Sequence, residues 1–129
     1  MHSIRYMVEK CKTYDIQRKY SGGAMDGFQC AEADSDTLDI FDGIDLDTLF
    51  ERYHIDGSIL VKMDIEGAER EIFKKIEHAK WITKIKVLAI EIHDQRCNDT
   101  NLSQSIVQTC KKYGLNGKKI GDIYVFNKR

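Results

Sequence analysis

The sequence predicts an α/β fold whose parallel strands are followed by an antiparallel pair. Two apolar runs rich in branched residues, 59–65 and 85–93, each end in acidic residues and flank a segment with helical periodicity. Short runs of this kind are typical of strands buried on both faces of a parallel sheet. Two further strand-like runs, 115–120 and 122–126, close the chain after a second helical segment.

Composition places the chain among soluble globular proteins and excludes several classes of partner. The 129 residues are 42% hydrophobic and 32% charged, which suits one domain with a buried core. A net charge of −1 gives no electrostatic basis for binding nucleic acid or an anionic membrane. No apolar run approaches the roughly 20 residues of a membrane span, and the first residues lack the pattern of a signal peptide. We therefore expect a cytoplasmic protein with reduced thiols.

The first 27 residues are expected to form a helix and a glycine-rich loop. Apolar residues recur at helical spacing to about Tyr14, and residues 21–27 contain three glycines. These glycines miss the G-x-G-x-x-G spacing of a dinucleotide loop, and no buried strand precedes them. A flexible connection is the preferred interpretation.

Residues 28–57 are expected to be mostly a solvated connection. Residues 28–32 could form a short strand, and the chain from Glu32 to Glu51 is acidic without an interrupting basic residue. The acids miss the register of a calcium-binding EF-hand loop, so turns and helix caps are the simpler interpretation. Within this segment we expect a brief extended piece at 44–46 and a helix capped by Asp47 that runs to about Tyr53.

The centre of the chain is residues 59–69, where a strand runs into a turn and then a helix. The strand ends at Asp64 and Glu66, and Gly67 lets the backbone turn tightly. Helical spacing of the apolar residues then predicts a helix from about residue 68 to residue 79. In open α/β sheets, ligands bind beyond the carboxyl ends of the strands, which is where these carboxylates stand.

The second apolar run repeats this arrangement and ends in Glu91, His93 and Asp94. Two strands joined through a helix are often neighbours in a parallel sheet. If so, Asp64, Glu66, Glu91 and His93 gather at one edge of the sheet. Beyond a polar loop, residues 103–113 are predicted to be a helix that stops at Gly114, followed by the antiparallel pair.

Several of these motifs together resemble one family, the FkbM-type methyltransferases. The resemblance covers residues 44–129 and is to the C-terminal half of the family fold; it rests on Leu46-Asp47-Thr48-Leu49, Ile55-Asp56, Lys62-Met63-Asp64-Ile65-Glu66-Gly67-Ala68-Glu69 and Ile90-Glu91-Ile92-His93. It implies a class I, Rossmann-like sheet in which the last strand is inserted antiparallel. It also implies S-adenosylmethionine-dependent O-methylation of a hydroxyl on a glycan or small natural product.

On this resemblance, the candidate catalytic residues are Asp64, Glu66, Glu91 and His93. His93 is the first candidate base because its ordinary pKa is near neutrality, and Asp64 is the second. Asp64 and Glu66 could also attract the cationic cofactor, and Glu91 could orient His93 if their side chains turn to the same side. Glu69 is expected only to favour the start of the helix electrostatically. None of these roles requires a metal ion.

The segment before residue 44 lacks the expected cofactor-binding features of the family. It shows no buried strand, no glycine loop in register and no acid placed for the ribose hydroxyls. We therefore expect a single domain over residues 1–129 that is a truncated or degenerate relative of the family, a fragment of a longer gene, or a subunit completed by a second copy or a partner chain. Two alternatives stay open, a catalytically silent interaction module and a divalent-metal hydrolase that uses the same four residues.

Overall fold

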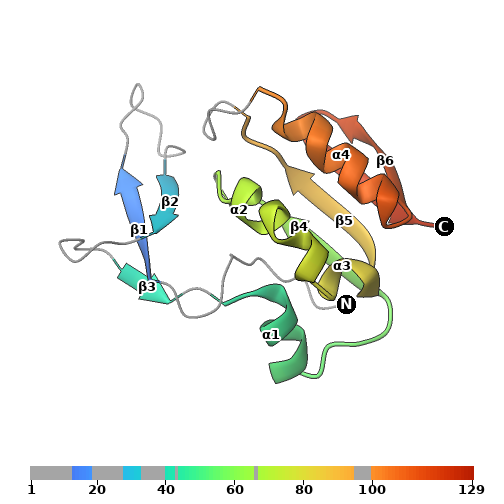
Figure 1. Cartoon of the computed structure of the whole chain (residues 1–129), viewed down its shortest axis with the longest axis horizontal. Helices are drawn as coiled ribbons and strands as arrows, with labels where there is room; N and C mark the ends of the chain where they lie inside the picture. Colours follow the sequence, from blue (N-terminus) through green and yellow to red (C-terminus); the bar gives the residue numbers. More distant parts are fainter. Residues whose placement is uncertain (1–12, 19–27, 33–39, 43, 66, 95–99) are drawn as a thin grey trace.

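The main body of the protein is a four-stranded mixed sheet with helices packed on it (Figure 1). The computed structural model describes residues 13–18, 28–32, 40–42, 44–65, 67–94 and 100–129. The strand order is β4-β5-β7-β6, where β4 is Ile59–Met63, β5 is Ile85–Glu91, β7 is Ile123–Lys128 and β6 is Leu115–Ile120. Strands β4 and β5 are parallel, and β7 is antiparallel to both β5 and β6. The predicted α/β class, these four strands and the antiparallel final strand are therefore confirmed.

Strands β4 and β5 determine where the site lies. Val61 pairs with Leu88 and Met63 with Ile90, so both strands end at the same edge of the sheet. Val61, Met63, Leu88 and Ile90 are at most 3% exposed, whereas the residues between them are partly exposed, so one face of these strands is buried more fully than the other and the prediction of strands buried on both faces holds only in part. The residues that follow Met63 and Ile90 therefore emerge side by side.

The connection from β4 to β5 differs from the single helix predicted over residues 68–79. It consists of α2, Glu69–Lys74, a 3-10 turn, η1, Ile76–His78, and a short helix, α3, Trp81–Lys84. Ile76, Trp81 and Ile82 are all buried, and the ring of Trp81 packs edge-on against Phe73. Packing of these side chains outweighs the helical periodicity of the local sequence.

Helix α1, Leu46–Arg52, ends within one residue of the predicted position but has a different cap. The backbone N–H of Thr48 donates to Asp45 Oδ1 at 2.7 Å, so Asp45 and not Asp47 is the N-cap. Asp47 Oδ2 instead accepts a hydrogen bond from the backbone N–H of Lys80 at 2.9 Å, which fastens α1 to the start of α3. The expected extended piece at 44–46 is shorter, because Leu46 already belongs to the helix.

A second, three-stranded antiparallel sheet forms from the N-terminal part of the chain, with the order β2-β1-β3. Strand β2, Phe28–Glu32, confirms the short strand predicted there. Strands β1, Thr13–Arg18, and β3, Ile40–Asp42, correct the prediction of a helix reaching residue 14 and of a connection without strands. Pairing of β1 on both sides decides this, because it satisfies backbone groups that a local pattern does not reveal. The rest of the predicted helix and the loop at 21–27 lie outside the described residues.

The C-terminal elements follow the prediction closely. Helix α4, Leu102–Lys112, is followed by Gly114 with φ 78°, and Gly121 with φ 62° lets the chain turn from β6 into β7. Helix α4 buries Leu102, Ile106 and Cys110 in the core, and Cys110 is a free cysteine. Within the described ranges, no helix has both the length and the apolar composition that a membrane span requires.

Candidate active site

The candidate site lies just beyond the carboxyl ends of β4 and β5. Asp64 follows β4 directly, Glu91 is the last residue of β5, and His93 stands two residues further on. One ligand atom from each of these three side chains lies within 4.8 Å of the others. The structure thus brings Asp64, Glu91 and His93 together, as the parallel pairing of the two strands requires. Glu66 lies outside the described residues, so its place in the site stays a prediction.

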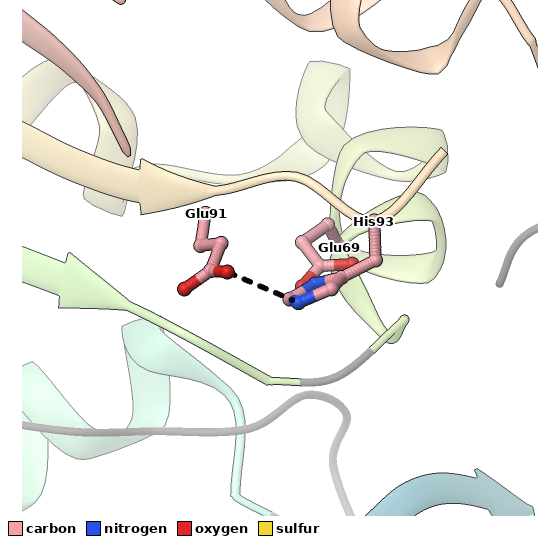
Figure 2. A network of polar contacts seen from close by, with 3 residues as sticks. All are labelled: Glu69, Glu91 and His93. Atoms are coloured by element: carbon pink, nitrogen blue, oxygen red, sulfur yellow. Dashed lines mark hydrogen bonds and ion pairs between the residues drawn. The ribbon is translucent and has the colours of Figure 1, made fainter. Parts of the chain in front are cut away.

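Among the described residues, His93 contacts Glu69, the first residue of α2. His93 Nδ1 and Glu69 Oε1 are 2.9 Å apart, a hydrogen-bonding distance. On the other side of the ring, Nε2 faces Glu91 Oε1 at 3.7 Å, which is too long for a direct hydrogen bond (Figure 2). Of the two glutamates, Glu69 and not Glu91 therefore lies within hydrogen-bonding distance of the ring, a contact that was not expected of Glu69.

Glu69 is an unusual residue for its position, because a carboxylate here has no access to water. It is 0% exposed and is the one charged or polar residue that is buried in the described part of the chain. Its Oε2 is buried and lacks a hydrogen-bond partner among the described groups. Burial of a charge costs several kcal/mol unless a partner compensates it, so the bond to His93 is the counterpart that makes this placement tolerable.

The turn between β4 and α2 brings Glu69 into contact with His93. Gly67 has φ 106°, a conformation that side-chain-bearing residues rarely adopt. Helix α2 begins two residues after this glycine, and the contact between Glu69 and His93 places its start beside the strand ends. Ala68, which is 5% exposed, packs into the core at this point and leaves the next residue facing the site.

The electrostatic surroundings of His93 favour its protonated form. The hydrogen bond to Glu69 raises the pKa of His93 above its ordinary value of 6.5, burial lowers it, and the charges of Glu69, Glu91 and Asp64 raise it further. Asp64 Oδ1 is buried and lacks a hydrogen-bond partner among the described groups. Three acidic side chains therefore surround one imidazole, an arrangement that suits a cationic ligand.

Asp94, which ends the same polar run, has a different task. Its carboxylate accepts hydrogen bonds from the backbone N–H of Ser103 at 2.8 Å and from the Ser103 hydroxyl. These bonds tie the end of the β5 segment to the first turn of α4. Asp94 therefore anchors the start of α4, and the candidate catalytic residues of this segment are Glu91 and His93.

Glu69 is the site residue that sequence reasoning missed, although a signal for it exists. The apolar face of the predicted helix passes through Ile72, Phe73 and Ile76, and Glu69 stands three, four and seven positions before them. A charged residue at the inward-facing position of an apolar stripe is rare unless it is paired. That register could have singled out Glu69 before the structure was known.

Fold and site together define an α/β protein with an acid-rich imidazole site at its strand ends. The family model described as the methyltransferase FkbM domain matches residues 18–116, and the chain therefore belongs to the FkbM methyltransferase family. The match begins well before residue 44, where the resemblance in the sequence was expected to start, and it includes β2 and β3. Searches of curated proteins and of solved structures gave no significant match.

Proposed function

We propose that this chain catalyses S-adenosylmethionine-dependent O-methylation of a hydroxyl on a glycan or small natural product. The observation that carries the proposal is the convergence of Asp64, Glu91 and His93 beyond β4 and β5, within 4.8 Å, in a chain of the FkbM methyltransferase family. Ligands of open α/β sheets bind at such strand ends. The acceptor and the cofactor are therefore both proposed to bind at this edge.

The strand order of the main sheet supports the proposal of a Rossmann-like class I architecture. The order β4-β5-β7-β6, with β7 antiparallel between two parallel neighbours, is the arrangement that the resemblance implies for the second half of such a sheet. In the described part of the chain, β4 forms one edge of this sheet, and edges of this kind invite pairing. We propose that a second copy or a partner chain completes the cofactor pocket there, and the cytoplasmic location stays a prediction.

The residues at the site fit a cationic cofactor. S-adenosylmethionine, when bound, supplies a methyl group on a positively charged sulfur, and methyl transfer to an oxygen is an in-line displacement. Asp64, whose Oδ1 is buried without a hydrogen-bond partner among the described groups, would attract the positive charge together with Glu66. Glu91, which is 37% exposed, is accessible to an acceptor hydroxyl.

His93 is proposed to remove the proton from the acceptor hydroxyl. Its Nε2 lies on the side of the ring that faces Glu91, away from Glu69. A positioned base contributes about 10²- to 10⁴-fold to a rate, and positioning of the reacting atoms contributes more. His93 can accept a proton only when it is neutral, so the reaction should accelerate as the pH rises through its raised pKa.

Calorimetric titration of S-adenosylmethionine into the purified chain tests the proposed cofactor directly. Wild type should bind in the micromolar range, and Asp64→Asn should weaken binding at least tenfold. Asp56→Asn is the matched control, because Asp56 is an exposed residue that precedes β4 in the sequence, whereas Asp64 follows it. Absence of binding at millimolar ligand, by the chain alone and with candidate partner chains, would contradict the proposal.

The divalent-metal hydrolase is the competing function that the geometry also allows. Carboxylate oxygens and an imidazole within 4.8 Å of one another could hold a magnesium or manganese ion. Titration with Mn²⁺ and an assay on phosphoesters separate the two functions. A silent interaction module would bind neither the cofactor nor the metal ion, and His93→Ala would then change stability alone.

A further inference from the structure

We propose that Glu69 is a positioning residue, which fixes the ring of His93 so that Nε2 is presented to the acceptor hydroxyl. The catalytic consequence rests on the proposed O-methyl transfer, whereas the arrangement of the two side chains can be tested without any activity. The proposal begins from a contact that the sequence did not suggest, between the start of α2 and the segment after β5 (Figure 2).

The hydrogen bond to Glu69 assigns the tautomer of neutral His93. An ionised carboxylate can only accept hydrogen bonds, so with Glu69 ionised the hydrogen in the 2.9 Å contact belongs to His93 Nδ1. A neutral imidazole carries one N–H and one free lone pair. With Nδ1 protonated, the lone pair is on Nε2, the nitrogen that faces Glu91 at 3.7 Å. This nitrogen is the one that can act as a base.

Burial distinguishes the two glutamates that flank the ring. The side chain of Glu69 is 0% exposed and that of His93 is 14% exposed, so water competes little for the bond between them. The side chain of Glu91 is 37% exposed and stands beyond hydrogen-bonding distance. Glu69 therefore holds the ring from inside the protein, while Glu91 stands on the side from which an acceptor can approach.

Within the described ranges, the Glu69 carboxylate has no hydrogen bond besides the one to His93, so the fold sets its position. Its Oε2 has no hydrogen-bond partner among the described groups, and its backbone belongs to the first turn of α2, just after the Gly67 turn. A carboxylate placed by the backbone gives a rigid support, and rigid support is what a base needs in order to be aligned before reaction.

The carboxylates that face His93 also determine the pH range in which the imidazole is neutral and can act as a base. Glu69, Glu91 and Asp64 all favour the imidazolium, and burial opposes them. Loss of the Glu69 charge and hydrogen bond should lower the pKa of His93 and leave the ring free to adopt either tautomer. A residue that does not contact the ring would change neither property of the imidazole, and the kinetic test below separates positioning from a purely structural pair.

Nitrogen NMR of the His93 ring in the wild-type chain is the first test. The ¹⁵N shifts of the neutral ring should identify Nδ1 as the protonated nitrogen, and the titration midpoint should lie above 6.5. A neutral ring protonated on Nε2, or a titration midpoint below 6.5, would overturn the proposal. This measurement needs no variant, cofactor or substrate, so it stands even if methyl transfer is not found.

Glu69→Gln provides the second test, and Glu71→Gln is its matched control. Both changes remove a negative charge from the first turn of α2, but Glu71 is on the surface, where it pairs with Lys74. Glu69→Gln should lower the His93 titration midpoint and mix the tautomers, whereas Glu71→Gln should leave both unchanged. Equal behaviour of the two variants would overturn the proposal.

Kinetics complete the test once an acceptor has been found. Glu69→Gln should lower kcat by about 10- to 100-fold, within the usual contribution of a positioned base, with little change in KM. The acid limb of the pH–rate profile should also move to lower pH. A rise in KM with an unchanged kcat would contradict a positioning role, and inactivity of wild type on every acceptor would count against the proposed function alone.

Discussion

Glu69, at the start of α2, and His93, beyond β5, are joined through a 2.9 Å contact across 24 positions of the sequence. The contact links the two halves of the site, because Asp64 precedes the α2 turn and Glu91 precedes His93. It couples the protonation of one imidazole to the folding of the β4–α2 junction. The pH dependence of stability and that of activity should therefore be connected.

Stability should fall as the pH rises through the folded-state pKa of His93. This pKa is raised above the unfolded value of 6.5, mainly by the hydrogen bond to Glu69, so the native state holds its proton more tightly than the unfolded chain. The resulting stabilisation is full below pH 6.5 and is lost above the folded pKa. Urea unfolding of wild type and Glu69→Gln across that window measures it. A flat wild-type profile, identical to that of the variant, would rule out the coupling.

Activity should have the opposite dependence on pH. The proposed base is the neutral imidazole, which becomes populated as the pH rises above the same raised pKa. The protein should therefore be most active where this contribution to its stability has been lost. A single titration of His93, compared with both profiles, checks whether one group controls them.

Gly67→Ala should destabilise the protein and disturb His93. The φ of 106° at Gly67 lies in a region that a residue with a Cβ enters at a cost of about 1 kcal/mol or more. The relaxed turn should displace Glu69 and weaken its bond to the imidazole. Gly114→Ala is the control, because φ is 78° there but the residue follows α4. Both variants should lose stability in urea, and Gly67→Ala alone should change the His93 NMR signals.

Asp45→Ala should cost about 0.5–2 kcal/mol of stability through the lost cap of α1. Asp45 accepts from both the backbone N–H and the hydroxyl of Thr48, and Asp45→Asn should retain most of the stability. Asp47→Ala removes a different bond, the one to the backbone of Lys80. Chemical denaturation of these variants and of Asp47→Asn checks the assignment. Asp47 would be the N-cap if Asp45→Ala left the free energy of unfolding unchanged, Asp47→Ala lowered it and Asp47→Asn kept the wild-type value.

Gly117→Ala should disrupt the pairing of β6 with β7. A Cβ at this position would lie 1.9 Å from the backbone oxygen of Val125, so the strands must separate to accommodate it. We expect a loss of about 1–3 kcal/mol, the usual cost of overpacking. Lys118→Ala, at an exposed neighbouring position, should be nearly neutral. Thermal melts compare the two, and equal melting temperatures would contradict the close approach of these strands.

The strands of the main sheet could be predicted because they carry their own local signal. Strands β4 and β5 are short apolar runs, and parallel pairing of such runs places Asp64, Glu91 and His93 at a common edge. The two C-terminal strands follow a helix that ends at a glycine, which is also a local signal. Side-chain periodicity alone is sufficient for these elements.

Other features depended on partners that are distant in sequence. The N-terminal strands β1 and β3 exist because they pair with each other, and the crossover helix breaks because Ile76 and Trp81 reach the core. Asp45 and not Asp47 caps α1, while Asp47 bonds to the backbone of Lys80, 33 residues away. In each case a tertiary contact chose between local arrangements of similar energy.

By itself, the sequence determined the α/β class, the four strands of the main sheet and the edge where the acidic residues gather. Only the tertiary structure decided that His93 bonds to Glu69 and not to Glu91. The physical reason is that periodicity states which face a residue occupies, whereas a hydrogen bond depends on positions set to within a few tenths of an ångström. Such positions are set when the Gly67 turn, α2 and β5 pack together.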